Sequence, residues 1–304
     1  MTRASQRRAG DAVAEHLDVI VRFHDPARLR ELNRCVFSLV GQTYRPVRII
    51  LALQRFSAAD IATTEAALAP LLDGEPDLHL SVINWEHADP ADARAVLLNL
   101  GLSVAQGRYL AFLDYDDVLY PEAYALLVER LRLTGSAIAF AAVRVMRLEV
   151  YRSYFYTAEE VVPTFKGAGL LDLFTTNFCP LHSYVIDRTA IPKAMLTFNS
   201  ALVMEEDYDL LLRICAAHKS DFALIGTRIG DYYYKTDGSN TVPTQGGIPA
   251  AEYDHYRTIR AAIAHRKATT LIAPDVQRAL GLAVASAPLT IADAVARMSG
   301  RTTP

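Results

Sequence analysis

Apolar and polar residues follow two different periods along the first half of the chain. Short apolar runs predict buried strands at residues 17–23, 47–53, 78–84, 109–113 and 136–146. Between these runs, apolar residues recur at helical spacing, which predicts helices within residues 24–42, 58–72, 91–106 and 121–134. Strands that alternate with helices form a mainly parallel sheet wound by right-handed crossovers. We therefore predict an α/β fold in which helices flank the sheet.

The pattern is less regular in the second half. It predicts a short helix at 170–177, a strand at 181–187 and an amphipathic helix at 208–219. It also predicts strand and loop at 150–169, two short strands at 221–235, a mobile loop at 236–249 and Ala-rich helix at 250–300. We expect one continuous domain with an N-terminal tail (1–16), a first half (17–118), a second half (119–245) and a C-terminal helical segment (246–304).

Three carboxylates follow the fourth predicted strand, in the stretch YLAFLDYDDVLYPE (109–122). Asp114, Asp116 and Asp117 are close enough in sequence to repel one another, and charges about 4 Å apart repel by roughly 4 kcal/mol at an effective dielectric near 20. Solvent, a basic neighbour or a bound cation must offset this repulsion. Parallel sheets bind ligands beyond the carboxyl ends of their strands, and Mg²⁺ prefers carboxylates together with substrate phosphates. A solvated turn is the simpler alternative.

The same residues also fit a second enzyme class. The stretch DYDDVL resembles the DxDx[TV][LV] pattern of haloacid-dehalogenase-type phosphatases, in which the first Asp is the nucleophile. That family places the pattern on its first strand, whereas three predicted strands precede it here. The later Lys and acidic pair that such a phosphatase needs are not clearly placed.

Composition narrows the class of partner and compartment. The 304 residues carry a net charge of -3, which gives no electrostatic reason to expect nucleic acid or an anionic membrane. The three cysteines lie far apart, which favours a reducing compartment over a disulfide framework. The longest apolar run (137–143) is too short for a transmembrane segment. We expect a cytoplasmic protein whose only membrane contact, if any, is peripheral.

Three stretches, in the right order, resemble family 2 glycosyltransferases with the GT-A fold. LDVIVRFHDPARLRELNRCVFSLVGQTYRPVRIILAL resembles their opening strand, polar loop, helix ending in SL..QTY.P, and second strand. ARAVLLNLGLSVAQGRYLAFLDYDDVLYPE resembles their central block with its Asp-x-Asp site. MEEDYDLLLRI (204–214) resembles their Glu-Asp-x-Asp-Leu motif on the acceptor side. The likeness fades after about residue 240.

The resemblance implies a role for each acidic residue. Asp114 would contact the ribose or a metal-bound water. Asp116 would ligate a divalent cation, Mg²⁺ or Mn²⁺, that bridges the donor diphosphate, with Asp117 in support. Asp207 would be the general base, and Glu206 beside it would lie on the acceptor side. A helix N-cap is the simpler role for Asp207.

Departures from the family pattern leave some roles open. The stretch LALQRFS replaces the family's Asp-Asp-Gly-Ser, so Gln54 is the candidate for a bond to the base. Arg22 stands in the first polar loop and is a candidate for the phosphate, with a plain surface or core-edge Arg as the alternative. In YYKTDGSNT, Asp237 is the candidate replacement for the family's late metal-binding His.

Two further side chains are candidates from their place in the sequence. Arg94 lies five residues before Asn99, at the start of a predicted helix, and could bind the diphosphate bidentately. His182 lies in the predicted strand at 181–187, and we weigh a role in acceptor binding against a structural one.

The resemblance implies a metal-dependent glycosyltransferase that inverts the anomeric configuration. Its donor would be a UDP-, GDP- or dTDP-sugar, and its acceptor would be a glycan or a lipid-linked acceptor. Its role would be the synthesis of cell-surface or secreted glycans, including polysaccharides. A catalytically silent module that binds sugar nucleotides, and the phosphatase, are the alternatives. The donor, the acceptor and the oligomeric state are open at this point.

Overall fold

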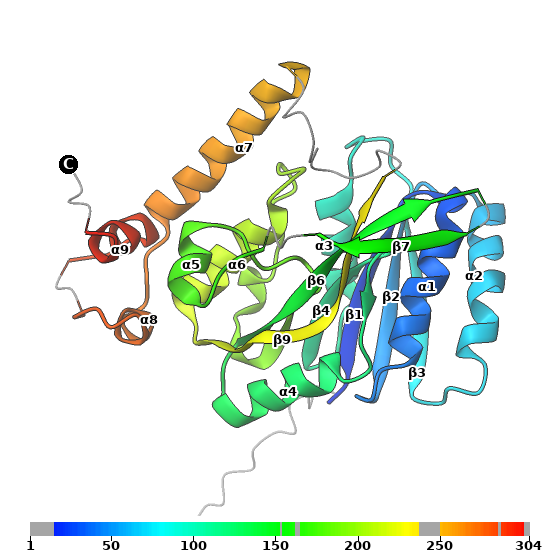
Figure 1. The fold of residues 1–304 in the computed structure, drawn as a ribbon, viewed down its shortest axis with the longest axis horizontal. Helices are drawn as coiled ribbons and strands as arrows, with labels where there is room; N and C mark the ends of the chain where they lie inside the picture. The colour runs from blue at the N-terminus through cyan, green and yellow to red at the C-terminus, as the bar shows by residue number, and fades with distance from the viewer. Residues whose placement is uncertain (1–14, 153, 162–164, 237–249, 285–286, 301–304) are drawn as a thin grey trace, which may run out of the picture.

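A computed structural model describes residues 15–152, 154–161, 165–236, 250–284 and 287–300. Nine strands form one sheet in the order β3-β2-β1-β4-β8-β6-β9-β5, and β7 pairs with β6 outside this path. Helices cover both faces of the sheet, and α7, α8 and α9 lie beside α5 and α6, at the opposite end of the molecule from α1 and α2 (Figure 1). The predicted α/β class, with a mainly parallel sheet in the first half, is confirmed.

The first half follows the sequence prediction closely. Its strands are β1 (Leu17–Phe23), β2 (Val47–Gln54), β3 (Leu78–Trp85) and β4 (Tyr109–Asp114), all parallel to their neighbours among the four. Its helices are α1 (Leu29–Val40), α2 (Ala58–Leu72) and α3 (Arg94–Val104), and α4 (Ala123–Thr134) follows in the second half. A 3₁₀ turn at Pro26–Arg28 leads into α1, and the Asp25 carboxylate caps it by accepting a hydrogen bond from Ala27 N at 2.9 Å.

The second half mixes strand directions. It contains β5 (Val118–Leu119), β6 (Ile138–Val150), β7 (Phe155–Glu160), β8 (Tyr184–Asp187) and β9 (Ser220–Lys235), with α5 (Leu170–Thr175) and α6 (Glu206–Ala217). Strand β8 runs antiparallel to β4 and β6, whereas β9 runs parallel to β6 with three register shifts. The prediction of two short strands at 221–235 is therefore wrong, because β6 pairs with a single strand that bends at these shifts.

Two other predictions need correction. The C-terminal helix predicted at 250–300 is three helices, α7 (Ala250–Thr269), α8 (Pro274–Ala279) and α9 (Ile291–Met298), because Pro274 starts a new helix and a β-bridge joins Leu271 to Thr290. The loop predicted at 236–249 lies outside the described residues except for its first position. In the described part of the chain, no helix has both the length and the apolar character needed to cross a membrane.

The two faces of the sheet are both buried. On β1, Val19 and Val21 pack with α1 on one face, whereas Ile20 faces α3 on the other. Helix α3 can approach closely because Gly101 has no side chain: a Cβ there would lie 2.6 Å from Cγ2 of Ile20. Full burial of a side chain such as Ile20 contributes about 1.5–3 kcal/mol. This core fixes where β1 and β4 end, and the functional residues lie at those ends.

Candidate active site

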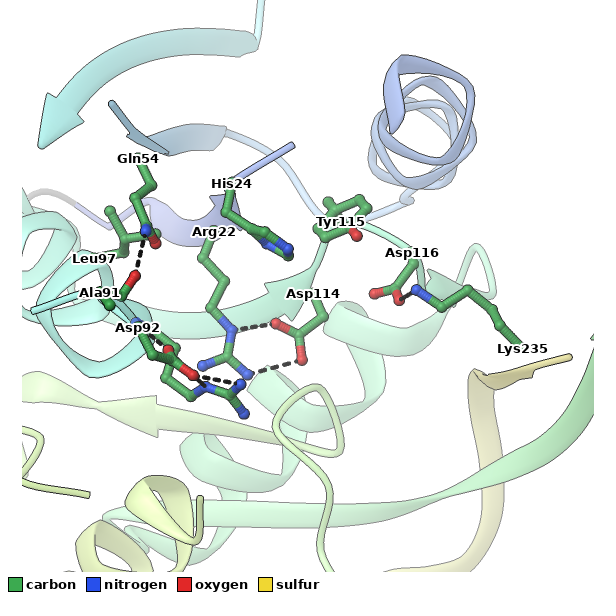
Figure 2. A pocket seen from close by; sticks show the side chains of 11 residues that line it. Arg22, His24, Gln54, Ala91, Asp92, Leu97, Asp114, Tyr115, Asp116 and Lys235 are labelled. Atoms are coloured by element: carbon green, nitrogen blue, oxygen red, sulfur yellow. Dashed lines mark hydrogen bonds and ion pairs between the residues drawn. The ribbon is translucent and has the colours of Figure 1, made fainter. Parts of the chain in front are cut away.

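A pocket of about 290 Å³ opens at the carboxyl ends of β1, β2 and β4. Parallel pairing brings distant parts of the sequence together there, since Arg22 on β1 is the register partner of Asp114 on β4. The lining residues are Arg22, His24, Gln54, Ala91, Asp92, Arg94, Leu97, Asp114, Tyr115, Asp116 and Lys235 (Figure 2). All five residues predicted to bind the donor, Arg22, Gln54, Arg94, Asp114 and Asp116, therefore line one pocket.

Arg22 joins the two halves of the site. Its Nε donates to Oδ1 of Asp114, its Nη2 to Oδ2 of the same carboxylate at 3.0 Å, and its Nη1 to Oε1 of Glu206 at 2.6 Å. Burial acts to raise the pKa of Asp114, but the Arg22 guanidinium outweighs it and holds that pKa below the usual range. Asp114 is therefore ionised at neutral pH. Both its oxygens are occupied, which disfavours the nucleophilic role that the phosphatase alternative needs.

Asp116 has a different cationic partner. Nζ of Lys235, the last residue of β9, lies 2.6 Å from Oδ2 of Asp116 (Figure 2). The Lys235 side chain is 3% exposed and its ammonium lies 5.6 Å from the centre of the Tyr115 ring. The repulsion within the Asp cluster is thus offset by basic neighbours, Arg22 for Asp114 and Lys235 for Asp116.

Asp117 is buried and does not line the pocket. Its Oδ1 accepts a hydrogen bond from Tyr233 N at 2.8 Å, and its Oδ2 lies 3.2 Å from Nδ1 of His182. Burial, followed by the charges of Asp116 and Asp114, raises the pKa of Asp117 well above its usual range. The raised pKa favours the neutral form of this carboxyl group, which faces the protein interior.

His182 is buried beside Asp117, with its ring parallel to that of Tyr232 at 6.2 Å between centres. Burial lowers its pKa to about 4, although nearby carboxylates act in the opposite direction. His182 is neutral at pH 7 and does not line the pocket. The predicted roles of Asp117 in metal binding and of His182 in acceptor binding stay predictions, and these positions give them no support.

A clamped loop forms the wall opposite Lys235. Gln54 Nε2 donates to Ala91 O at 2.9 Å, and Arg55 Nε donates to His87 O at 2.8 Å. Arg94, the first residue of α3, pairs with Asp92, with Nε 3.0 Å from Oδ1. These bonds hold the loop between β3 and α3 against the end of β2. They also fix the side chains of Gln54 and Arg94 at the edge of the pocket.

The acidic start of α6 lies behind Arg22. The helix begins at Glu206, two residues earlier than predicted, so Asp207 is its second residue rather than the residue before it. Glu205 is the N-cap and makes no side-chain capping bond, so the N-cap alternative for Asp207 is wrong. Oδ1 of Asp207 accepts from Tyr208 N at 2.7 Å and lies 3.4 Å from Nδ2 of Asn177.

The protonation of Asp207 is strongly perturbed. Burial is the largest cause that raises its pKa well above the usual range, and the charges of Glu206 and Glu205 add to it. This is the direction expected for a carboxylate that must take up a proton near neutral pH. Asp207 is not among the pocket-lining residues, but the Glu206–Arg22 ion pair joins its helix to them.

The described residues do not fit a divalent cation at Asp116. Within them, no group of three or more His, Cys, Asp and Glu side chains is arranged to hold a metal ion. Lys235 holds one oxygen of Asp116, and Asp117 faces away from the pocket. The third predicted ligand, Asp237, lies outside the described residues.

Four polar lining residues were not among the sequence candidates: His24, Asp92, Tyr115 and Lys235. Desolvation lowers the pKa of His24, although nearby carboxylates act in the opposite direction. Lys235 lies within the stretch YYKTDGSNT, two residues before Asp237, the candidate replacement for the family's metal-binding His. The candidate in that stretch, Asp237, lies outside the described residues, so its role in metal binding stays a prediction.

Comparison with known proteins identifies relatives of this chain. The chain is 28% identical to the succinoglycan biosynthesis protein ExoO of Rhizobium meliloti (strain 1021) over 153 residues. This match covers 48% of this chain and 42% of ExoO. It is 30% identical to the uncharacterized glycosyltransferase YibD of Escherichia coli (strain K12) over 98 residues. This match covers 32% of this chain and 26% of YibD. The chain thus spans less than half the length of either relative.

Solved structures agree on the fold. The crystal structure of residues 1–349 of S. aureus TarS covers 84% of this chain and 66% of its own, with a TM-score of 0.54 and 13% sequence identity. At this identity the likeness shows the GT-A fold alone. The sequence profile of glycosyl transferase family 2 matches residues 19–191, which is more than half of the chain and includes the Asp cluster. The protein therefore belongs to glycosyl transferase family 2.

Proposed function

We propose that the protein is a glycosyltransferase that moves a sugar from a nucleoside-diphosphate sugar to an acceptor hydroxyl. The observation that carries this proposal is the pocket at the carboxyl ends of β1, β2 and β4, where Arg22 links the donor-side Asp114 to Glu206 on α6. Ligands of open α/β sheets bind at this edge. The family membership makes a nucleotide sugar the expected ligand.

The two halves of the domain supply the donor side and the acceptor side of the site. Residues 17–118 supply Gln54 to the base and Arg94 to the diphosphate, and residues 119–245 supply the acceptor side through α6. One TarS structure of similar fold is a complex with UDP, at a TM-score of 0.53, so UDP-sugars are the first donors to test. The name of ExoO, a succinoglycan biosynthesis protein, supports a polysaccharide acceptor.

Asp207 is the proposed general base. Burial and two neighbouring glutamates raise its pKa, so the carboxylate gains proton affinity where an acceptor hydroxyl must lose its proton. A positioned base of this kind accelerates transfer by about 10²–10⁴-fold. Attack by the activated hydroxyl in line with the departing diphosphate would invert the anomeric configuration. The family resemblance implies Mg²⁺ or Mn²⁺ at Asp116, where a divalent cation would stabilise the charge of the departing diphosphate.

A donor panel tests this function. UDP-, GDP- and dTDP-sugars are screened first by thermal shift and then by release of the nucleoside diphosphate, each with and without Mn²⁺. We expect one base and one sugar to raise the melting temperature and to be turned over. Binding without any release of nucleoside diphosphate would favour the silent sugar-nucleotide module, and binding of no nucleotide sugar would contradict the proposal.

A further inference from the structure

Lys235 occupies the position at Asp116 where the family resemblance expects a divalent cation. Its side chain is almost fully buried, yet its ammonium borders the pocket and lies 2.6 Å from Oδ2 of Asp116. A buried lysine needs such a partner, because removing an unpaired charge from water costs several kcal/mol. Strand β9 fixes the lysine, since Tyr234 and Lys235 pair with Arg147 and Leu148 of β6.

The charge balance of the pocket depends on this residue. The lining contains three cationic side chains and three carboxylates, so its formal charge is balanced. Without Lys235, the lining would be negative and would repel a diphosphate. A divalent cation would then be needed to bring the diphosphate close to Asp116.

We propose that Lys235 is a phosphate-binding residue that neutralises the donor's diphosphate at Asp116, in place of a divalent cation. This inference rests on the proposed function and names how that site holds its ligand. Asp116 orients the ammonium, and the ammonium can donate to the diphosphate while it keeps this ion pair. Donor binding is then independent of Mg²⁺ and Mn²⁺.

Calorimetric titration of the purified chain tests this inference without a turnover assay. The probes are UDP, GDP, dTDP and inorganic pyrophosphate, each titrated in EDTA and in Mn²⁺. The wild type should bind at least one nucleoside diphosphate in EDTA with a Kd within about threefold of the value in Mn²⁺. Lys235→Met should weaken that binding at least about tenfold in EDTA. Mn²⁺ should restore it, because the variant leaves both oxygens of Asp116 free for a metal.

Two further variants keep the test decisive. Lys219→Met removes the lysine that immediately precedes β9, at the other end of the strand from Lys235, and should leave both titrations unchanged. Lys235→Met leaves Asp116 without its cation and is destabilised for that reason, whereas Asp116→Asn/Lys235→Met removes both charges. The double variant should fold, as judged by circular dichroism, and should bind weakly in EDTA and in Mn²⁺.

Three results would overturn the inference. Wild-type binding that is lost in EDTA would show that a metal is required, while leaving the proposed function intact. Undiminished binding by Lys235→Met in EDTA would show that other cations hold the diphosphate. If no nucleoside diphosphate bound under any condition, the proposed function would fail, and this inference would fail with it.

Discussion

At the residue scale, the three carboxylates that follow β4 have three different environments. Asp114 is held ionised by Arg22, Asp116 pairs with Lys235, and Asp117 is buried against Tyr233 N with a raised pKa. The sequence predicts that charges of this density need compensation. It cannot predict which of them faces ligand, because the partners come from strands that lie far along the chain.

The pH dependence of transfer tests the role of Asp207. A base acts only when ionised, so the rate should rise with pH through a pKa above the usual Asp value near 4. Glu205→Gln removes one of the charges that raise this pKa, so the rising limb should move to lower pH. The measurement is initial rate against pH for the wild type and the variant.

Glu65→Gln on the exposed face of α2 is the matched control and should leave the profile in place. An unchanged limb in Glu205→Gln would argue that another group sets the profile. A fall in rate at every pH, with no shift, would point to a structural role for Glu205.

At the element scale, the sequence predicts best where an element carries its own signal. The bounds of β1 and α2 agree with the prediction at both ends, because a buried apolar run and a capped helix are local patterns. The bend of β9 depends on its pairing with β6, and the arrangement of α7, α8 and α9 depends on contacts with distant helices, although Pro274 is a local signal for the start of α8. The start of α6 was misplaced for a similar reason, since Glu206 enters the helix while its carboxylate is bound by Arg22.

Close packing of α3 on β1 makes a prediction about stability. Gly101→Val places new atoms against Ile20, which is fully buried and whose Cγ2 would lie 2.6 Å from the new Cβ. We expect the free energy of unfolding to fall by about 1–3 kcal/mol, measured by urea denaturation. Gly226→Val is the control, because no atom lies within 4 Å of a Cβ at that exposed position of β9. Equal stability of Gly101→Val and the wild type would show that the α3–β1 contact is not close-packed.

At the scale of the whole molecule, two ion pairs join the halves of the domain across the pocket. Arg22 reaches Glu206 on α6, and Lys235 at the end of β9 reaches Asp116 after β4. The predicted division into donor-side and acceptor-side halves agrees with this layout but is not tested by it. The family and the GT-A fold could be predicted from the sequence. The two ion pairs between the halves could not, because each joins residues more than 100 positions apart.

The most direct test of the central claim follows the anomeric proton of the donor sugar by ¹H NMR. The donor that the panel identifies is incubated with the protein and no acceptor, so that water replaces the hydroxyl and the sugar is observed before it mutarotates. We predict release of the sugar in the inverted configuration. Asp207→Asn should release it at least about 100-fold more slowly while it keeps donor affinity and melting temperature. A sugar released with retained configuration, or release by Asp207→Asn at the wild-type rate, would contradict the account.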